Sequence, residues 1–186
     1  KWALTPDREG AFERTETWAP IFPHLELEEL WEHSANDLEI IRARDLETDR
    51  AVWLVVAGER RVNALGGADV WRRSYQALRQ LNDQCLARVL DFGDLGECFY
   101  IVLEAHDGEA LDVVAPSLEV SALEAIVRQV TDAVTSARLF GVALSFGFAE
   151  VIVVPQGRAV LLPLLETAIE TTMIESPVSS HALEPG

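Results

Sequence analysis

Three short stretches of the sequence carry residue types that could do chemistry. Asp91-Phe92-Gly93 contains a carboxylate, the type of group that binds divalent cations. His106-Asp107 pairs a potential general base with a carboxylate, and Glu150 offers another acid. The sequence contains no nucleophile elbow, metal-ligand box or phosphate-binding loop to accompany them. A lone His-Asp pair in a loop is usually solvated, so these residues by themselves predict no catalytic site.

The composition excludes several classes of partner. Hydrophobic residues make up 49% of the 186 residues, which predicts a folded chain. Asp and Glu number 31 against 15 Lys and Arg, giving a net charge of -16. That field repels phosphate backbones and anionic lipid surfaces, so we expect no nucleic-acid partner and no direct membrane binding. Cys85 and Cys98 lack metal-ligand spacing, and we expect buried free thiols and no metal site.

The ends of the chain predict segments outside the folded body. We expect residues 1–23 to form an irregular arm whose aromatics pack on the body, and residues 167–186 to form a linker-like tail. No apolar run reaches the length of a membrane span and no signal peptide is present, which predicts a cytoplasmic location. The first residue is not Met, so we expect a fragment, and the tail would suit a membrane anchor outside these residues.

Hydrophobic periodicity predicts a mixed α+β domain. Strands are expected at Leu25–Trp31, Asp37–Asp45, Arg50–Gly58, Leu86–Phe92 and Cys98–Glu104, followed later by a hairpin at Val151–Leu162. A helix is expected at Ala68–Asp83, after Gly66-Gly67. A second is expected at Ser121–Leu139, where Ser121 and Glu124 have capping-box spacing and Val127 belongs to the apolar stripe.

The order of these elements resembles a bacterial eukaryotic-like Ser/Thr protein kinase. "RARDLETDRAVWLVV" resembles the second and third strands of that family, and "ALRQLNDQCLARVLDFG" resembles the end of helix C and the fourth strand. "CFYIVLEAHDGEAL" is similar to the fifth strand and hinge, with Leu103 as gatekeeper and Glu104 opening the hinge. "RQVTDAVTSARLFGVALSFGFAEVIVVPQGRAVLL" resembles the helix before the catalytic loop, that loop and the following hairpin.

The resemblance, which covers residues 25–166, implies a protein-kinase-like fold of the α+β class. It implies a first lobe at residues 24–104, with a five-stranded antiparallel sheet and helix C. A partial second lobe would follow at residues 105–166, with a helix, a degenerate catalytic loop and a hairpin, as in a C-terminally truncated member. In this register Asp91 precedes the hinge, whereas the magnesium-binding triplet of a kinase follows the catalytic loop. We therefore expect Asp91 to lie at a β-turn and to bind no metal.

The resemblance also assigns the positions of kinase chemistry to residues that cannot perform it. The glycine-rich loop falls at His33, Ala35 and Leu38, the strand lysine at Val55, the helix C glutamate at or near Ser74, the adenine-pocket alanine at Trp53, the catalytic-loop positions at Phe146, Phe148 and Val151, and the magnesium triplet at Pro163-Leu164-Leu165. Trp53 and Val55 share a strand face. We expect these apolar side chains to fill the old nucleotide cleft, leaving no catalytic residue, no cofactor site and no metal site.

These substitutions predict a catalytically inactive, pseudokinase-like module that does not bind ATP and serves a protein partner in scaffolding or regulation. An acidic α+β partner-binding module, chaperone-like and unrelated to kinases, is the alternative, and it would form a stable dimer without a cleft. An enzyme of another kind is the third reading. The alternative to the absence of ATP binding is that another lysine or arginine on a neighbouring strand, such as Arg42, substitutes for the missing lysine.

Overall fold

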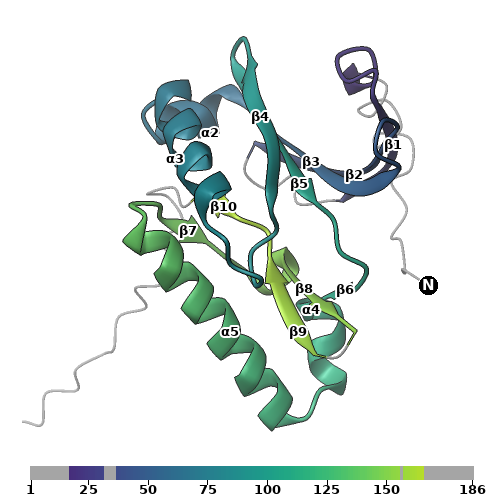
Figure 1. Ribbon diagram of the computed structural model, residues 1–186, viewed down its shortest axis with the longest axis vertical. Helices are drawn as coiled ribbons and strands as arrows, with labels where there is room; N and C mark the ends of the chain where they lie inside the picture. The colour runs from purple at the N-terminus through teal and green to yellow at the C-terminus, as the bar shows by residue number, and fades with distance from the viewer. Residues whose placement is uncertain (1–16, 32–36, 156, 166–186) are drawn as a thin grey trace, which may run out of the picture.

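A computed structural model describes residues 17–31, 37–155 and 157–165. The predicted glycine-loop positions His33 and Ala35, most of the arm and the whole tail lie outside these residues. The described chain forms two lobes in sequence order, a sheet with two helices followed by a smaller part built around one long helix (Figure 1).

The first lobe is a five-stranded sheet in which every neighbouring pair is antiparallel. The strand order is β1 (Leu25–Trp31), β2 (Leu38–Asp45), β3 (Arg50–Ala57), β5 (Cys98–Glu104) and β4 (Val89–Leu95). Consecutive strands that are connected by short turns pair directly, as the alternating sequence pattern predicts.

Both faces of the sheet are buried at its central strand β3, which explains why β3 is apolar at almost every position. Ile41 and Leu54 face one side, where Phe22 covers them and packs edge-on against the ring of Tyr100 at 5.1 Å. The residues that alternate with them along the strands, such as Ile40 and Val55, face the other side, where the helices and the second lobe lie. The described part of the arm therefore acts as a lid on the outer face of the sheet.

The chain between β3 and β4 forms two helices, which lie on the inner side of the sheet (Figure 1). The short α2 (Glu59–Ala64) was not expected from the sequence, and α3 (Ala68–Gln80) follows it. Gly66 and Gly67 separate them with φ values of 93° and 89°, a region that side chains other than glycine rarely enter. Helix α3 buries Trp71 and Tyr75, which pack against Phe99 and continue to Phe92.

The second lobe packs the long helix α5 (Val120–Leu139) against a hairpin (Figure 1). Its shorter elements are β6 (Glu109–Ala110), α4 (Leu111–Val114), η2 (Ala115–Ser117), β7 (Leu144–Ser145), η3 (Phe148–Glu150), β8 (Val151–Val154), β9 (Arg158–Leu161) and β10 (Leu164–Leu165). Strands β6, β8 and β9 form one small sheet, and β7 pairs with β10. Within the described residues, no helix is long and apolar enough to cross a membrane.

Several local expectations were wrong. The helix predicted to reach Asp83 ends at Gln80, and the strand predicted from Leu86 begins at Val89. The reason is tertiary, because residues 85–87 pair with the end of β9 through the Ala87 amide and the Leu161 carbonyl at 2.9 Å. Cys85 is buried as expected, whereas Cys98 is only half-buried, and burial raises the pKa of both free thiols.

The start of α5 also differs from the sequence prediction. The capping residue is Glu119, which makes no side-chain capping bond, so Ser121 and Glu124 lie inside the helix and form no capping box. Val127 is 42% exposed, and the buried stripe continues through Ala133 and Ala137. The small alanines allow the helix to approach the hairpin closely, and a pattern based on large apolar residues misses them.

Gly67→Ala should destabilise the fold by about 1–3 kcal/mol, because its φ of 89° and ψ of 176° define a conformation reserved for glycine. No heavy atom lies within 4 Å of the added methyl group, so the cost would come from the backbone alone. Gly96→Asn is the matched control. Asparagine tolerates the positive φ of 72° at that turn, and its effect should be smaller. Urea unfolding measures both, and equal stability losses would contradict the prediction.

Candidate functional site

The region between the lobes, where the resemblance places the nucleotide cleft, is the candidate site, and its centre on β3 is apolar. Val55 has no exposed surface and lies between Ile40 of β2 and Ile101 of β5 on the neighbouring strands. A charged ammonium group there would lose its hydration without gaining a partner from either neighbour. The position that the resemblance assigned to a lysine is thus part of the hydrophobic core.

A pair of indole rings occupies the adjoining part of the cleft. Trp53 is 7% exposed, and its ring centroid lies 5.0 Å from that of Trp31 at the end of β1. Leu103, at the predicted gatekeeper position, is the cross-strand partner of Trp53 and is fully buried. The expectation that Trp53 and Val55 are buried together is confirmed. The contribution of Trp31 was missed, because the pattern that predicted its strand does not show which residue of another strand its ring contacts.

Arg42, the candidate substitute cation, already contacts an aromatic ring and two carboxylates within the chain. Its guanidinium carbon lies 5.5 Å from the centroid of the Trp53 ring, in cation–π geometry. Its side chain also contacts the carboxylates of Glu28 at 3.6 Å and Asp107 at 3.4 Å. Arg42 therefore connects the first two strands and the hinge across the indole face, and two carboxylates balance its charge.

Helix α3 contacts the second lobe through Tyr75 rather than through Ser74. Ser74 is half-buried, whereas the fully buried Tyr75 hydroxyl donates to the carbonyl oxygen of Pro163 at 3.0 Å. Burial raises the pKa of this phenol, which stays protonated and able to donate. On α2, the buried Arg61 donates to the carbonyl of Leu165 at 3.1 Å. Both helices thus bind the backbone of the segment that corresponds to the magnesium triplet.

The structure brings side by side the two segments that the resemblance aligned with the catalytic loop and the magnesium triplet of a kinase. Ser145 of β7 is the cross-strand partner of Leu164 of β10, and Val151 and Leu164 are buried. The expectation that Phe146 and Phe148 fill the cleft was wrong, since they are 43% and 48% exposed. Strand β7 ends at Ser145, and the chain then turns outward, so the aromatic rings point to solvent.

Glu150, the acid beside the predicted catalytic loop, serves local structure. The Glu150 carboxylate accepts a hydrogen bond from the Gly147 amide at 2.5 Å and closes the turn before β8. Across residues 17–31, 37–155 and 157–165, no three His, Cys, Asp or Glu side chains gather in a way that could hold a metal ion.

The Asp91-Phe92-Gly93 triplet has a structural explanation, although not the predicted one. It lies within β4, just after a bulge, and the turn comes later at Gly96. The Tyr100 ring lies over Gly93, where a Cβ atom would be 2.8 Å from it. The Tyr100 hydroxyl donates to Asp91 at 2.9 Å. The glycine thus makes room for a ring whose hydroxyl the aspartate binds, while Phe92 joins the cluster beneath α3.

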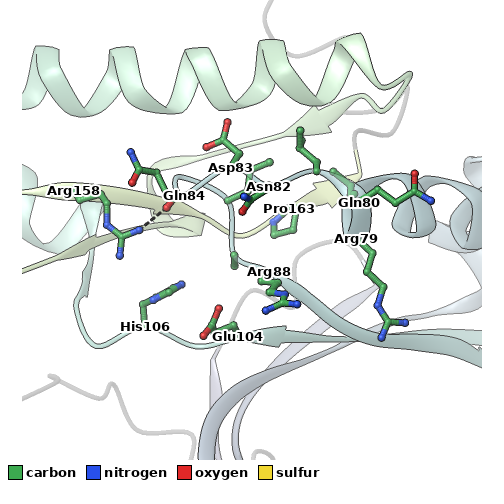
Figure 2. A pocket seen from close by; sticks show the side chains of 14 residues that line it. Arg79, Gln80, Asn82, Asp83, Gln84, Arg88, Glu104, His106, Arg158 and Pro163 are labelled. Carbon is green, nitrogen blue, oxygen red and sulfur yellow. Dashed lines mark hydrogen bonds between the residues drawn. The ribbon is translucent and has the colours of Figure 1, made fainter.

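His106 and Asp107 face different surroundings and form no catalytic pair. Asp107 contacts Arg42, whereas His106 lines a cavity of about 490 Å³ behind the hinge (Figure 2). Burial lowers the pKa of His106, which favours its neutral form. Glu104, Arg88 and Arg158 line the same cavity, and no pattern along the sequence groups these three residues.

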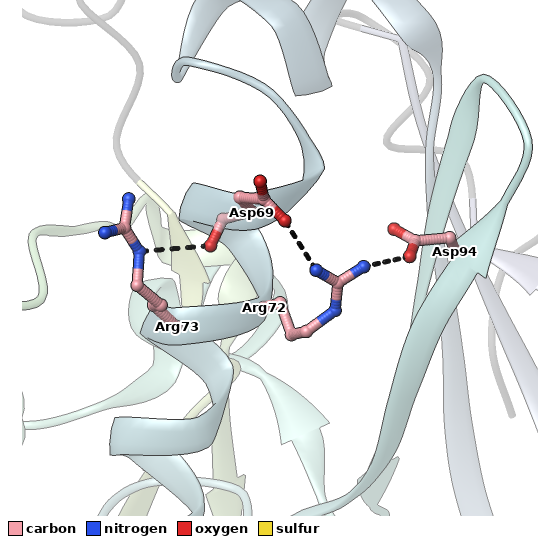
Figure 3. Close-up of polar contacts among 4 residues, drawn as sticks. All are labelled: Asp69, Arg72, Arg73 and Asp94. Carbon is pink, nitrogen blue, oxygen red and sulfur yellow. Dashed lines mark hydrogen bonds and ion pairs between the residues drawn. The ribbon is translucent and has the colours of Figure 1, made fainter.

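A chain of ion pairs on the surface attaches α3 to β4 (Figure 3). Arg72 contacts Asp69 on the same helix at 2.6 Å and Asp94 on the strand, and Arg73 donates to the Asp69 carbonyl at 3.3 Å. These groups are largely exposed, so they orient the helix more than they stabilise it.

Comparison with solved structures identifies the fold. The chain superimposes on the crystal structure of Rad53 residues 1–466 in complex with AMP-PNP with a TM-score of 0.63 and 17% identity, covering 77% of this chain and 39% of that one. It superimposes on the PknI kinase domain of M. tuberculosis with a TM-score of 0.58 and 22% identity, covering 76% and 58%.

These matches show a protein-kinase-like fold, with a five-stranded antiparallel sheet, its helices and a small second part. The chain spans less than two thirds of the length of either structure. No protein-family model and no curated protein matches the sequence. The predicted fold class is therefore confirmed, and identities this low extend the likeness to the fold alone.

Tyr75→Phe should destabilise the chain by about 1–3 kcal/mol, because it leaves the buried Pro163 carbonyl without its donor. Tyr100→Phe removes the other tyrosine hydroxyl, whose bond to Asp91 is exposed to solvent, and should cost less than about 0.5 kcal/mol. Chemical unfolding of the two variants compares them directly. A larger loss for Tyr100→Phe would contradict the prediction.

Asp91→Ala should change a tyrosine titration and leave metal response unaltered. Burial, followed by the hydrogen bond to Asp91, raises the pKa of Tyr100 to about 12. Without the carboxylate that pKa should fall towards its usual value, as ultraviolet absorbance would record. Magnesium should leave the melting temperature of both proteins unchanged. A magnesium-induced rise that is present in the original chain and lost in Asp91→Ala would refute the structural reading of the triplet.

Proposed function

We propose that this chain is a catalytically inactive, pseudokinase-like module that does not bind ATP and acts by binding another protein. The observation that carries the proposal is the packing of Trp53 and Val55 in the interlobe core, where the resemblance places the adenine pocket and the phosphate-binding lysine. Phosphoryl transfer depends on cations and metal ligands around the phosphates, and the apolar side chains at these positions provide neither.

The surroundings of the cleft support the same proposal. Trp31 packs against Trp53, and two carboxylates flank Arg42, so the nearest cation is neutralised. Tyr75 and Arg61 bind the backbone of residues 163–165 and hold that segment against the helices. A nucleotide would have to displace aromatic packing and separate existing ion pairs before gaining any contact.

The role in the cell follows as part of the proposal. A kinase-like fold that performs no catalysis can still bind other proteins, and in signalling it would act as a scaffold or a regulator. The resemblance favours a bacterial protein in the cytoplasm, either free or anchored by a segment outside these residues. The net charge of -16 favours a protein partner over nucleic acid. The alternative of a chaperone-like module on an unrelated scaffold loses its main ground, because the fold is kinase-like.

ATP with magnesium should leave the melting temperature of this chain unchanged. A ligand at about 100 times its dissociation constant would stabilise the folded state by roughly 2.7 kcal/mol, which a thermal-shift titration detects easily. A nucleotide-binding kinase domain measured in parallel shows that the titration works. A saturable rise in the melting temperature of this chain would overturn the proposal.

Two arginine variants identify the source of any such rise. Arg42→Ala removes the cation beside Trp53. Arg44→Ala removes another cation of β2, one that pairs with Asp49 at 2.6 Å. A rise that vanished with Arg42→Ala and survived Arg44→Ala would assign ATP binding to Arg42 as a substitute cation. We expect neither variant to respond to ATP.

A further inference from the structure

The cavity behind the hinge collects cationic side chains in a strongly acidic protein. Its volume is about 490 Å³, within the range of ligand-binding pockets. Three arginines line it, Arg79 at the end of α3, Arg88 before β4 and Arg158 in β9, although the whole chain has only 15 Lys and Arg against 31 Asp and Glu. The lining thus holds three arginines against two carboxylates, Asp83 and Glu104, an excess of positive charge opposite in sign to that of the molecule as a whole.

Two of these arginine side chains have no partner within the part of the chain that the structure describes. Arg42, Arg44 and Arg72 are all ion-paired. By contrast, the side chains of Arg79 and Arg88 make no hydrogen bond or ion pair with any residue that the structure describes. A guanidinium group that is not used within the chain keeps its planar set of donors for an external carboxylate or phosphate.

The third arginine and the histidine define the other end of the cavity. Arg158 donates to the Gln84 carbonyl at 2.5 Å, which fixes its guanidinium group at the cavity wall (Figure 2). His106 is held towards its neutral form by burial, so it can accept or donate a hydrogen bond without adding charge. Of the two carboxylates in the lining, Asp83 is bound to the Cys85 amide at 2.8 Å.

The arrangement of these groups suits an extended ligand better than a single anion. Figure 2 shows Arg158 at one end of the cavity and Arg79 at the other, with Arg88 between them, rather than three groups aimed at one point. The side-chain amides of Gln80 and Asn82 lie along the same wall and could bind peptide groups.

We propose that this cavity is a docking site for a short acidic segment of a partner protein, whose carboxylates pair with Arg79, Arg88 and Arg158. The proposal rests on the protein-binding role proposed above and names the chemistry of the partner. It places the docking site behind the hinge, on the cavity that His106 lines, and not in the cleft where Asp107 contacts Arg42.

The test uses a fluorescein-labelled peptide of alternating Glu and Ser, with a Gln-Ser peptide of the same length as the neutral control. The acidic peptide should bind saturably by fluorescence anisotropy, and the neutral one should not. Arg79→Gln combined with Arg88→Gln should weaken binding by about tenfold or more, because two charge-assisted contacts are lost. Both residues are exposed, so thermal unfolding should show that the double variant remains folded.

The matched control combines Arg60→Gln with Arg128→Gln, which removes the same charge from exposed positions on α2 and α5. It should bind the acidic peptide within about twofold of the original chain, since long-range effects of two charges are small in salt. Equal weakening in the two double variants would show that only net charge matters and would overturn the proposal. Absence of saturable binding to the original chain would also overturn it.

Amide chemical-shift mapping locates the bound peptide. Changes should gather at residues 79–88, 104–106 and 158, and changes confined to another surface would refute the assignment. Inorganic phosphate that competes as strongly as the peptide would reassign the cavity to a single free anion and refute the extended ligand. If the chain binds neither ATP nor the peptide, only the docking-site inference fails. If the chain binds ATP, the proposed function fails.

Discussion

The hydrophobic core shared by the two lobes is the constraint on which the rest of the structure depends. One continuous cluster of buried side chains runs from Leu38 on β2 through Val55 on β3 to Leu165 at the end of the described chain. Each large apolar side chain removed from water contributes about 1.5–3 kcal/mol. Opening the cleft would expose several of them together. In this protein the space between the lobes therefore serves stability, and it fixes how the lobes lie relative to each other.

Polar contacts across this core are few, and they use the backbone. Tyr75 and Arg61 bind carbonyl oxygens of residues 163–165, and the Ala87 amide binds the Leu161 carbonyl. Because such carbonyls are unsatisfied when a donor is lost, these contacts select one position of the C-terminal segment. Charged side chains act mainly outside the core, where ion pairs such as that of Arg72 with Asp94 contribute little to stability but leave the pattern of surface charge available for recognition.

Predictions based on a repeating pattern agreed with the structure, and those based on one local motif often did not. Strands Leu25–Trp31 and Cys98–Glu104 have the predicted bounds, because alternation over several residues reflects burial on the faces of a sheet. Asp91 lies in a strand instead of a turn, where it accepts a hydrogen bond from Tyr100 on the neighbouring strand and Gly93 makes room for the Tyr100 ring. Phe146 and Phe148 are exposed, because the two-residue strand β7 ends before them. The apolar character of a side chain does not by itself show whether the side chain points to the core or to solvent.

The sequence by itself determined the α+β class, the order of the main elements and the apolar character of Val55 and Trp53, because these follow from periodicity and residue type along the chain. Only the tertiary structure decided that Tyr75 binds Pro163, that Trp31 covers Trp53 and that Arg79, Arg88 and Arg158 share one cavity. Residues 79 and 158 are far apart in sequence and come to line one cavity because β9 pairs with the segment after α3. Neither periodicity nor local propensity contains information about such long-range neighbours.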